Sequence, residues 1–297
     1  MEKMTQEEEF AEYKKGLEIY KPEKWLNWDE HYYLRNWKKD SDHFLEKGYY
    51  KWMAEELGKY VNPKTLLDIG CGNGNAIIQL LKSFPSLEKV IAIEINAKCI
   101  EKTKNNLEKT GYEVEVIKRN HPKCEDKNKG LFKNVFDDID DLKLTSKITI
   151  IEGDMHNDDN LYDFLSKNLK VDAITCWLIG INHSIQRNID FTLKYECSDS
   201  NYRFLVQNKV YEIADLVLNS DGILQIVDRI PCAAIGEAET QIRKSHEDQA
   251  SVTKLKIRGI SSIPYELPKE GVAMTISGNG GNVESFNPNF VSVITSR

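Results

Sequence analysis

With 297 residues and 40% hydrophobic content, the chain is long enough for one large domain, or for one domain with an elaboration. Its formal net charge of -7 excludes general affinity for nucleic acid or anionic membrane, and no apolar run approaches the roughly 20 residues of a membrane span. The N-terminus MEKMTQEEEF lacks the apolar core of a secretion signal, and the six cysteines never stand in CxxC spacing. We therefore expect a cytoplasmic protein with reduced thiols and no zinc site.

Residues 1–60 are rich in aromatic side chains, with thirteen of the 28 aromatic residues and four of the five tryptophans. Apolar spacing predicts helices over 7–20 and 42–60, separated by the aromatic stretch WLNWDEHYYLRNW. We interpret the region as a helical cap. Its aromatic side chains either pack on the main domain or form a lid over a ligand site, and the two interpretations are compatible. Tyr33 is a candidate substrate contact from this region, with plain packing as its alternative role.

From residue 62 onward, short apolar segments alternate with helical patterns. Five buried strands are predicted at 65–69, 89–95, 147–154, 171–180 and 222–230, and the helices between them at 74–84, 97–111 and 211–222. Strands that are apolar throughout and separated by helices indicate a parallel sheet covered on both faces. Two further strand candidates, 255–267 and 290–297, have no convincing helix between them and are expected to form an antiparallel edge. Residues 61–297 are therefore predicted to form a doubly wound, mostly parallel seven-stranded α/β domain.

Two segments interrupt this alternation. Residues 112–146 are too long for a simple connection; they contain a possible strand, YEVEVIKR, then a basic stretch and an acidic run. We expect a solvated insertion there, with a docking loop for a partner or substrate as the alternative. Residues 182–208 follow the fourth buried strand and include His183 and Arg187. Ligands bind beyond the carboxyl ends of parallel strands, so this second insertion is a candidate wall of an acceptor pocket.

The glycine-rich stretch DIGCGNGN follows the first strand directly. Glycines at such a turn permit positive φ and let the backbone approach a ligand without side-chain clash. A phosphate-binding P-loop would need GK[ST], but Gly74 is followed by Asn75 and Ala76. Asn75 also stands where a dinucleotide fingerprint has glycine or alanine, and the lysine, HRD and DFG motifs of protein kinases are missing.

DIGCGNGN resembles the E/DxGxGxG motif of the class I S-adenosylmethionine-dependent methyltransferases. IAIEIN, EGDMHN and VDAITCWLIGINHS resemble the family's later elements and occur in the expected order, each at a predicted strand end. The resemblance covers residues 62–230 well and the final strands loosely, but neither residues 1–60 nor the 112–146 insertion. It implies an enzyme that uses S-adenosylmethionine as its cofactor.

The resemblance also implies roles for individual residues. Glu94 would hold the ribose hydroxyls, because a carboxylate can accept two hydrogen bonds from a vicinal diol. In the family, the residue after it packs on the adenine, and the end of the third strand reads the adenine amino group. Motif IV lies beside the reactive methyl. The cofactor-binding set implied is Asp68, Gly70, Cys71, Gly72, Glu94, Ile95, Asp154, Met155 and Cys176.

The methyl acceptor is less defined than the cofactor. His183 is the candidate general base, although an imidazole there could equally only shape the loop. Trp177, Arg187 and Tyr33 are the candidate substrate contacts, and Arg187 could hold an acceptor carboxylate. CWLIG lacks the [DNS]PP[YFW] motif of DNA amino-methylating enzymes, and the fourth strand ends without an acidic metal ligand, so neither DNA nor a metal ion is expected.

We therefore expect methyl transfer to O or N, possibly of a carboxylate, in a small molecule or peptide. The alternatives are an RNA or protein methyltransferase, against which the acidic charge counts for a large RNA, and a non-catalytic scaffold that binds S-adenosylmethionine. The oligomeric state stays open.

Overall fold

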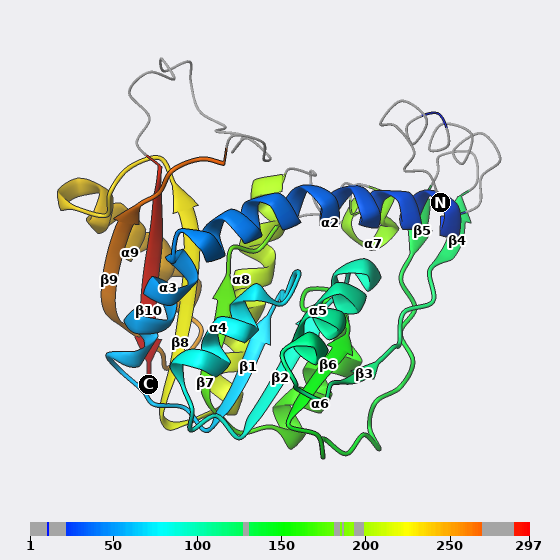
Figure 1. Cartoon of the computed structure of the whole chain (residues 1–297), viewed down its shortest axis with the longest axis horizontal. Helices are drawn as coiled ribbons and strands as arrows, with labels where there is room; N and C mark the ends of the chain where they lie inside the picture. The colour runs from blue at the N-terminus through cyan, green and yellow to red at the C-terminus, as the bar shows by residue number, and fades with distance from the viewer. Residues whose placement is uncertain are drawn as a thin grey trace.

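The computed structural model describes residues 11, 22–126, 131–180, 185, 187–192, 199–268 and 288–297 (Figure 1). The helix predicted over 7–20, apart from residue 11, lies outside these residues, and so does the candidate base His183.

One eight-stranded sheet, in the order β3-β6-β2-β1-β7-β8-β10-β9, forms the centre of the molecule. From β3 to β8 all neighbours are parallel, and β10 is antiparallel to both β8 and β9. The strands are β1 (Thr65–Ile69), β2 (Lys89–Glu94), β3 (Glu115–Ile117), β6 (Ile148–Glu152), β7 (Val171–Trp177), β8 (Leu218–Ile230), β9 (Lys256–Pro264) and β10 (Asn289–Ser296). The predicted α/β class, with its antiparallel edge, is confirmed. The count is eight instead of seven because β3, from the first insertion, adds an outer strand.

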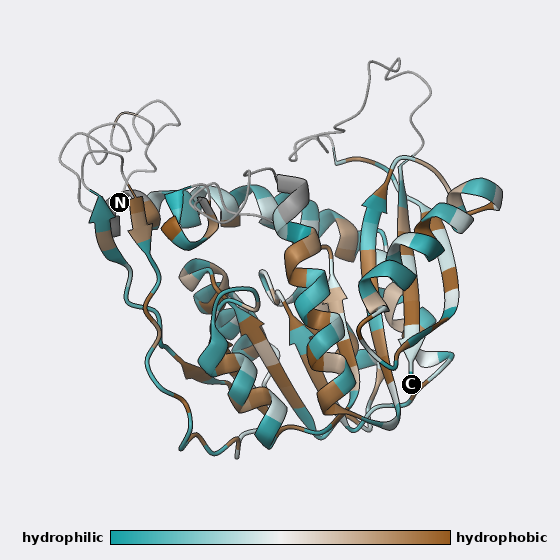
Figure 2. Ribbon diagram, turned by 180° about the vertical axis from the view of Figure 1, so that it is seen from behind, coloured by the Kyte–Doolittle hydropathy of each residue, from teal (hydrophilic) through white to brown (hydrophobic). Residues whose placement is uncertain are grey.

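Helices cover both faces of the sheet. On one face α3 (Tyr49–Gly58), α4 (Asn75–Ser83) and α5 (Ala97–Lys109) form a buried cluster with the strands; on the other, α6 (Asp159–Asn168) and α8 (Asp199–Val217) do so. Successive strand residues point to opposite faces, so Leu66 lies in the first cluster and Leu67 in the second. Seen from behind, the strands are largely hydrophobic while the outer sides of the helices are hydrophilic (Figure 2).

One helix prediction on this framework needs correction, and α6 was not among the predicted helices. The helix expected over 211–222 is the second half of α8, and β8 already begins at Leu218. The polar helix α9 (Gly236–Ala250), which packs beside β9, was not predicted. Only His246 and Ala250 of α9 are buried. A helix with so few buried residues needs no apolar stripe, and its sequence therefore gives only a weak helical periodicity.

The long helix α2 (Pro22–Glu46) runs across the carboxyl ends of the parallel strands (Figure 1). The aromatic stretch WLNWDEHYYLRNW is therefore part of a helix and not a connection between two helices. The single helix expected over 42–60 is also wrong, because α2 ends at Glu46 and α3 begins at Tyr49. Gly48 between them has φ of 77°, a left-handed conformation that suits glycine and turns the chain sharply.

The first insertion is anchored to the sheet. After β3 it forms an antiparallel hairpin of β4 (Lys123–Asp126) and β5 (Leu131–Lys133), next to the short helix α7 (Ile189–Thr192) and near the start of α2 (Figure 1). The Arg119 side chain is 1% exposed and forms an ion pair with Asp158 at 2.7 Å. The expectation of a solvated insertion is therefore wrong at Arg119, because its side chain is buried and paired with Asp158.

Two properties of the whole chain can be stated for the described residues. The cysteines among them, Cys71, Cys99, Cys124, Cys176 and Cys232, are all free. No helix in this part of the chain combines the length and the apolar character needed to cross a bilayer.

Candidate functional site

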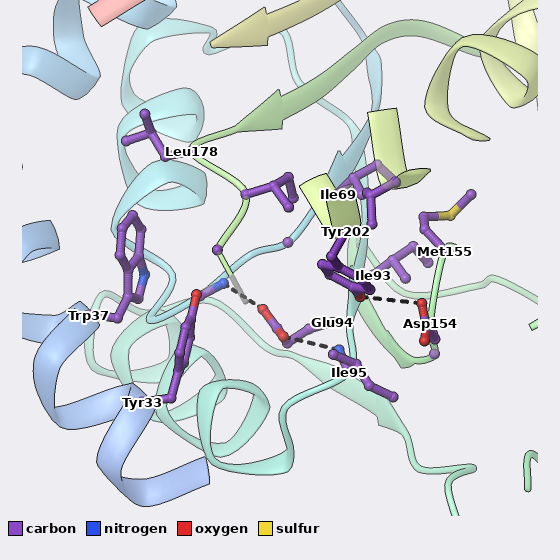
Figure 3. A pocket seen from close by; sticks show the side chains of 16 residues that line it. Tyr33, Trp37, Ile69, Ile93, Glu94, Ile95, Asp154, Met155, Leu178 and Tyr202 are labelled. Atoms are coloured by element: carbon purple, nitrogen blue, oxygen red, sulfur yellow. Dashed lines mark hydrogen bonds between the residues drawn. The ribbon is translucent and has the colours of Figure 1, made fainter. Parts of the chain in front are cut away.

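A cavity of about 60 Å³ lies at the carboxyl edge of the sheet, between the ends of β1, β2, β6 and β7 (Figure 3). The chain winds from β1 to β2 on one side of β1, and β7 lies on its other side. This reversal of winding is where open α/β sheets bind their ligands.

The glycine turn after β1 forms one wall of the cavity. Gly70, Gly72 and Gly74 have φ of 81°, 56° and 84°, which side chains other than glycine rarely adopt. A Cβ at Gly70 would lie 2.6 Å from Ile179 Cδ1, and one at Gly72 would lie 2.3 Å from Trp37 Nε1. The bare backbone is thus required both by the turn and by the close approach of neighbouring side chains.

Glu94, at the end of β2, connects this turn to the start of α5. Its carboxylate accepts hydrogen bonds from the backbone N–H groups of Gly72 at 2.9 Å, Ile95 at 3.0 Å and Asn96 at 3.0 Å (Figure 3). Burial raises the pKa of Glu94, and these three donors oppose that shift. The backbone therefore holds the carboxylate in a fixed orientation at the cavity wall.

Asp154 and Met155, which follow β6, line the cavity across from the glycine turn. Asp154 Oδ1 accepts a hydrogen bond from the His156 N–H at 2.9 Å, and the Tyr202 hydroxyl of α8 donates to it at 3.4 Å. Burial, followed by the charge of Asp154, raises the pKa of Tyr202 well above its ordinary value. The Asp154–Tyr202 hydrogen bond thus connects the end of β6 with the 182–208 segment, which was expected to form a wall of the acceptor pocket. Tyr202 itself was not predicted as a site residue.

α2 covers the cavity with Tyr33 and Trp37 (Figure 3). The Tyr33 hydroxyl approaches Gly180 so closely that a Cβ there would lie 2.2 Å from it. Just before Gly180, Leu178 has φ of 58°, an unusual left-handed conformation for leucine that turns the chain after β7. The lid helix and the segment after β7 therefore close over the strand ends.

A buried hydrogen-bond network fastens the second half of α2 to the glycine turn. The Ser41 hydroxyl donates to Asn73 Oδ1 at 2.7 Å. The Asn75 amide donates to Ser41 Oγ at 3.1 Å and to Asp42 Oδ1 at 3.0 Å. The two asparagines of GNGN therefore bind the cap, a role that sequence reasoning missed because the partner residues lie more than thirty positions away.

Asp68 lies behind the cavity wall. Its Oδ1 accepts a hydrogen bond from the Thr175 hydroxyl at 2.6 Å, whereas its buried Oδ2 has no hydrogen-bond partner among the described residues. Burial, followed by the charge of Glu94, raises the pKa of Asp68 to about 7. A buried carboxyl oxygen in this state suits a ligand that brings a hydrogen-bond donor, such as an amino group.

Several of the predicted site residues have side chains that do not line this cavity. Cys71 packs against Thr103 on α5, and Cys176 is buried against the α6 and α8 face of the sheet. The Trp177 indole donates to Gln225 Oε1 at 3.0 Å inside the core. Strand β7 reaches the cavity only through Leu178 to Gly180, beyond its last residue. Arg187 also stands outside the cavity wall. Among the predicted residues, Gly70, Gly72, Glu94, Ile95, Asp154, Met155 and Tyr33 do line it.

Comparison with known protein families identifies the family to which this chain belongs. The family Methyltransf_31, described as a methyltransferase domain, matches residues 62–265. No curated protein matches the chain.

Among solved structures, the methyltransferase domain of bacterial CtHen1 is 14% identical with a TM-score of 0.43, covering 84% of this chain and 98% of that one. Precorrin 8w decarboxylase from Methanobacterium thermoautotrophicum is 16% identical with a TM-score of 0.39, covering 82% and 88%. Trm5b from Pyrococcus abyssi is 13% identical with a TM-score of 0.42, covering 82% and 47%.

Proposed function

Because this chain belongs to the class I S-adenosylmethionine-dependent methyltransferases, we propose that it methylates an O or N atom of a small molecule or peptide. The observation that supports the proposal is a convergence on one cavity. The bare backbone at Gly72, the Glu94 carboxylate and the Asp154 turn come from three strand ends and meet beneath α2.

The residues present fit the cofactor. In the proposed arrangement Glu94 holds the ribose hydroxyls, Ile95 and Met155 flank the adenine, and Asp154 accepts from the adenine amino group. The unpartnered Oδ2 of Asp68 supports a further contact, to the amino group of the methionine end. When bound, S-adenosylmethionine supplies a methyl group on a positively charged sulfur.

The chain's own contribution is positioning and exclusion of water. Transfer of a methyl group requires the acceptor in line with the donor, and fixed geometry of this kind can supply several kcal/mol. Tyr33 and Trp37 provide aromatic faces that suit a positive sulfur. Both side chains lie over the cavity from α2, so they would cover the cofactor when it is bound. This supports the lid interpretation of the cap, which we propose for residues 1–60 over a methyltransferase domain of residues 61–297.

Protonation of the acceptor decides whether a base is needed. For an alcohol, phenol or ammonium acceptor we propose His183 as the base that removes the proton, because it stands a few residues after β7 in the sequence and imidazole titrates near neutrality. A carboxylate acceptor would need no base.

Calorimetry with S-adenosylmethionine and its demethylated product tests the proposal. The intact chain should bind both, and Glu94→Ala should weaken binding at least about tenfold, because charge-assisted hydrogen bonds contribute about 1.5–3 kcal/mol each. Glu101→Ala, an exposed carboxylate on α5, is the matched control and should bind like the intact chain. Failure of the intact chain to bind either compound would refute the proposal. Tight binding without transfer of a labelled methyl group to any cell extract would favour a scaffold.

A further inference from the structure

A second cavity of about 60 Å³ lies beside the first. The two share five wall residues: Tyr33, Glu94, Ile95, Gly180 and Tyr202. The rest of the second wall comes from α2, the first insertion and the segment around α7. This second cavity therefore adjoins the proposed cofactor site.

Two acceptors of the second cavity can serve a ligand, the Glu30 carboxylate and Asn120 Oδ1. Glu30 of α2 lines it, and the Glu30 carboxylate accepts a hydrogen bond from the Ala97 N–H at the start of α5. Asn120 lines it as well; its amide nitrogen donates to Asn134 Oδ1 at 3.0 Å, and its buried Oδ1 has no hydrogen-bond partner among the described residues. Within the described part of the wall there is no lysine, arginine or histidine.

The surroundings of Glu30 favour a positively charged ligand over a negatively charged one. Burial raises the pKa of Glu30, and the negative charges of Glu152 and Asp29 raise it further. The positive charge of Lys98 lowers the pKa, but its effect is smaller than that of burial. Together these effects raise the pKa of Glu30 to about 7. Phe132, Tyr33 and Tyr202 complete the wall with aromatic rings, whose faces attract positive charge. An anionic ligand would meet a half-buried carboxylate here, whereas a cation would offset its negative charge.

We infer that the second cavity is the acceptor site of the enzyme and that it binds a small primary or secondary amine as its ammonium form. The ammonium passes one proton to the base, for which His183 is proposed above, before its nitrogen attacks the methyl group. Glu30 and Asn120 Oδ1 accept the ammonium hydrogen bonds, and Leu26 and Ile185 contact the carbon chain. The inference rests on the proposed methyltransferase function and narrows it to nitrogen acceptors. Since Glu94 belongs to both cavities and is assigned to the cofactor, Glu30 is the carboxylate left for the acceptor.

Three probes of equal carbon number test the charge preference: butylamine, 1-butanol and butyrate. Each is titrated by ligand-observed NMR into the full chain saturated with the demethylated cofactor, at pH 8. Butylamine should bind at least about tenfold more tightly than butyrate. Glu30→Gln, which keeps the side-chain shape and removes the charge, should weaken butylamine at least about tenfold and change 1-butanol less than about twofold. Glu46→Gln, an exposed carboxylate in the last turn of α2, is the matched control and should change neither.

The pH dependence gives a second readout. Butylamine stays protonated between pH 6 and pH 8, like lysine, whereas Glu30 becomes ionised across this range. Butylamine affinity should therefore rise from pH 6 to pH 8 in the intact chain. The rise should be smaller in Glu30→Gln, in which Glu94, whose pKa burial also raises, still lines the cavity.

The inference is overturned if butyrate binds as tightly as butylamine, if Glu30→Gln leaves butylamine binding unchanged, or if no probe binds. Binding of the demethylated cofactor is measured on the same samples. If the intact chain does not bind the demethylated cofactor, the proposed function is refuted. If it binds the cofactor but shows no preference for butylamine, only the acceptor inference is refuted.

Discussion

The ion pair that anchors the first insertion can be tested by Arg119→Met. The Arg119 and Asp158 side chains are 1% and 2% exposed, with Nη1 and Oδ2 at 2.7 Å. The guanidinium also donates from Nε and Nη2 to the carbonyl oxygen of Asp137, at 3.0 and 2.7 Å. Methionine retains much of the volume but leaves Asp158 as an unpaired buried charge. Removing one partner of a buried pair costs about 3–5 kcal/mol, so we expect a loss of that size.

Urea unfolding measures this loss. With a denaturant dependence of roughly 3 kcal/mol per M, a loss of about 3–5 kcal/mol lowers the midpoint by about 1–1.7 M. Asp158→Asn removes the charge yet keeps an oxygen for the Leu161 N–H, which Asp158 caps at 3.0 Å. The double variant should therefore be at least about 2 kcal/mol more stable than the sum of the two single losses indicates. A loss below about 1 kcal/mol for Arg119→Met, or strictly additive losses, would refute the reasoning.

Two further predictions concern the cap and the glycine turn. Ser41→Ala should cost about 1–3 kcal/mol in urea unfolding and speed hydrogen exchange in α2, because the buried amides of Asn73 and Asn75 lose a partner; unchanged exchange would contradict the proposed attachment. For Asp68, burial raises the folded-state pKa from 3.8 to about 7, so the folded chain keeps a proton that the unfolded chain loses, and stability without ligand falls as pH rises from about 4 to 7. Asp68→Asn should remove this dependence and gain up to about 4 kcal/mol over the intact chain by pH 8. Parallel stability profiles for the two proteins between pH 5 and pH 8 would disprove it.

The sequence by itself determined the sheet and most of the cofactor edge. The parallel strands were predictable because apolar runs of strand length, separated by helical periodicity, are local patterns. Gly70 and Gly72 were predictable for the same reason, since the need for positive φ is a property of the turn itself. Glu94 and Asp154 were named through the family resemblance, and they lie near one another because the carboxyl ends of parallel strands share one edge.

The direction of the side chains at the end of β7 could not be predicted from the sequence pattern. Cys176 and Trp177 stand at the end of β7, inside the strand predicted over 171–180. Both point into the core, and the chain reaches the cavity only after the left-handed turn at Leu178. A one-residue difference in where a strand stops decides whether a side chain faces ligand or core, and strand boundaries are the least certain part of a sequence pattern.

Only the tertiary structure decided what surrounds that edge. Asn75 is a mismatch to a dinucleotide motif in the sequence and a partner of Ser41 in the fold. Arg119 belongs to a charged insertion in the sequence and to a buried ion pair with Asp158 in the fold. Glu30 carries no sequence signal, and it faces a cavity because α2 lies across the strand ends. These roles depend on contacts between segments some thirty to seventy residues apart, and such contacts form only when burial of the two faces of the sheet brings those segments together.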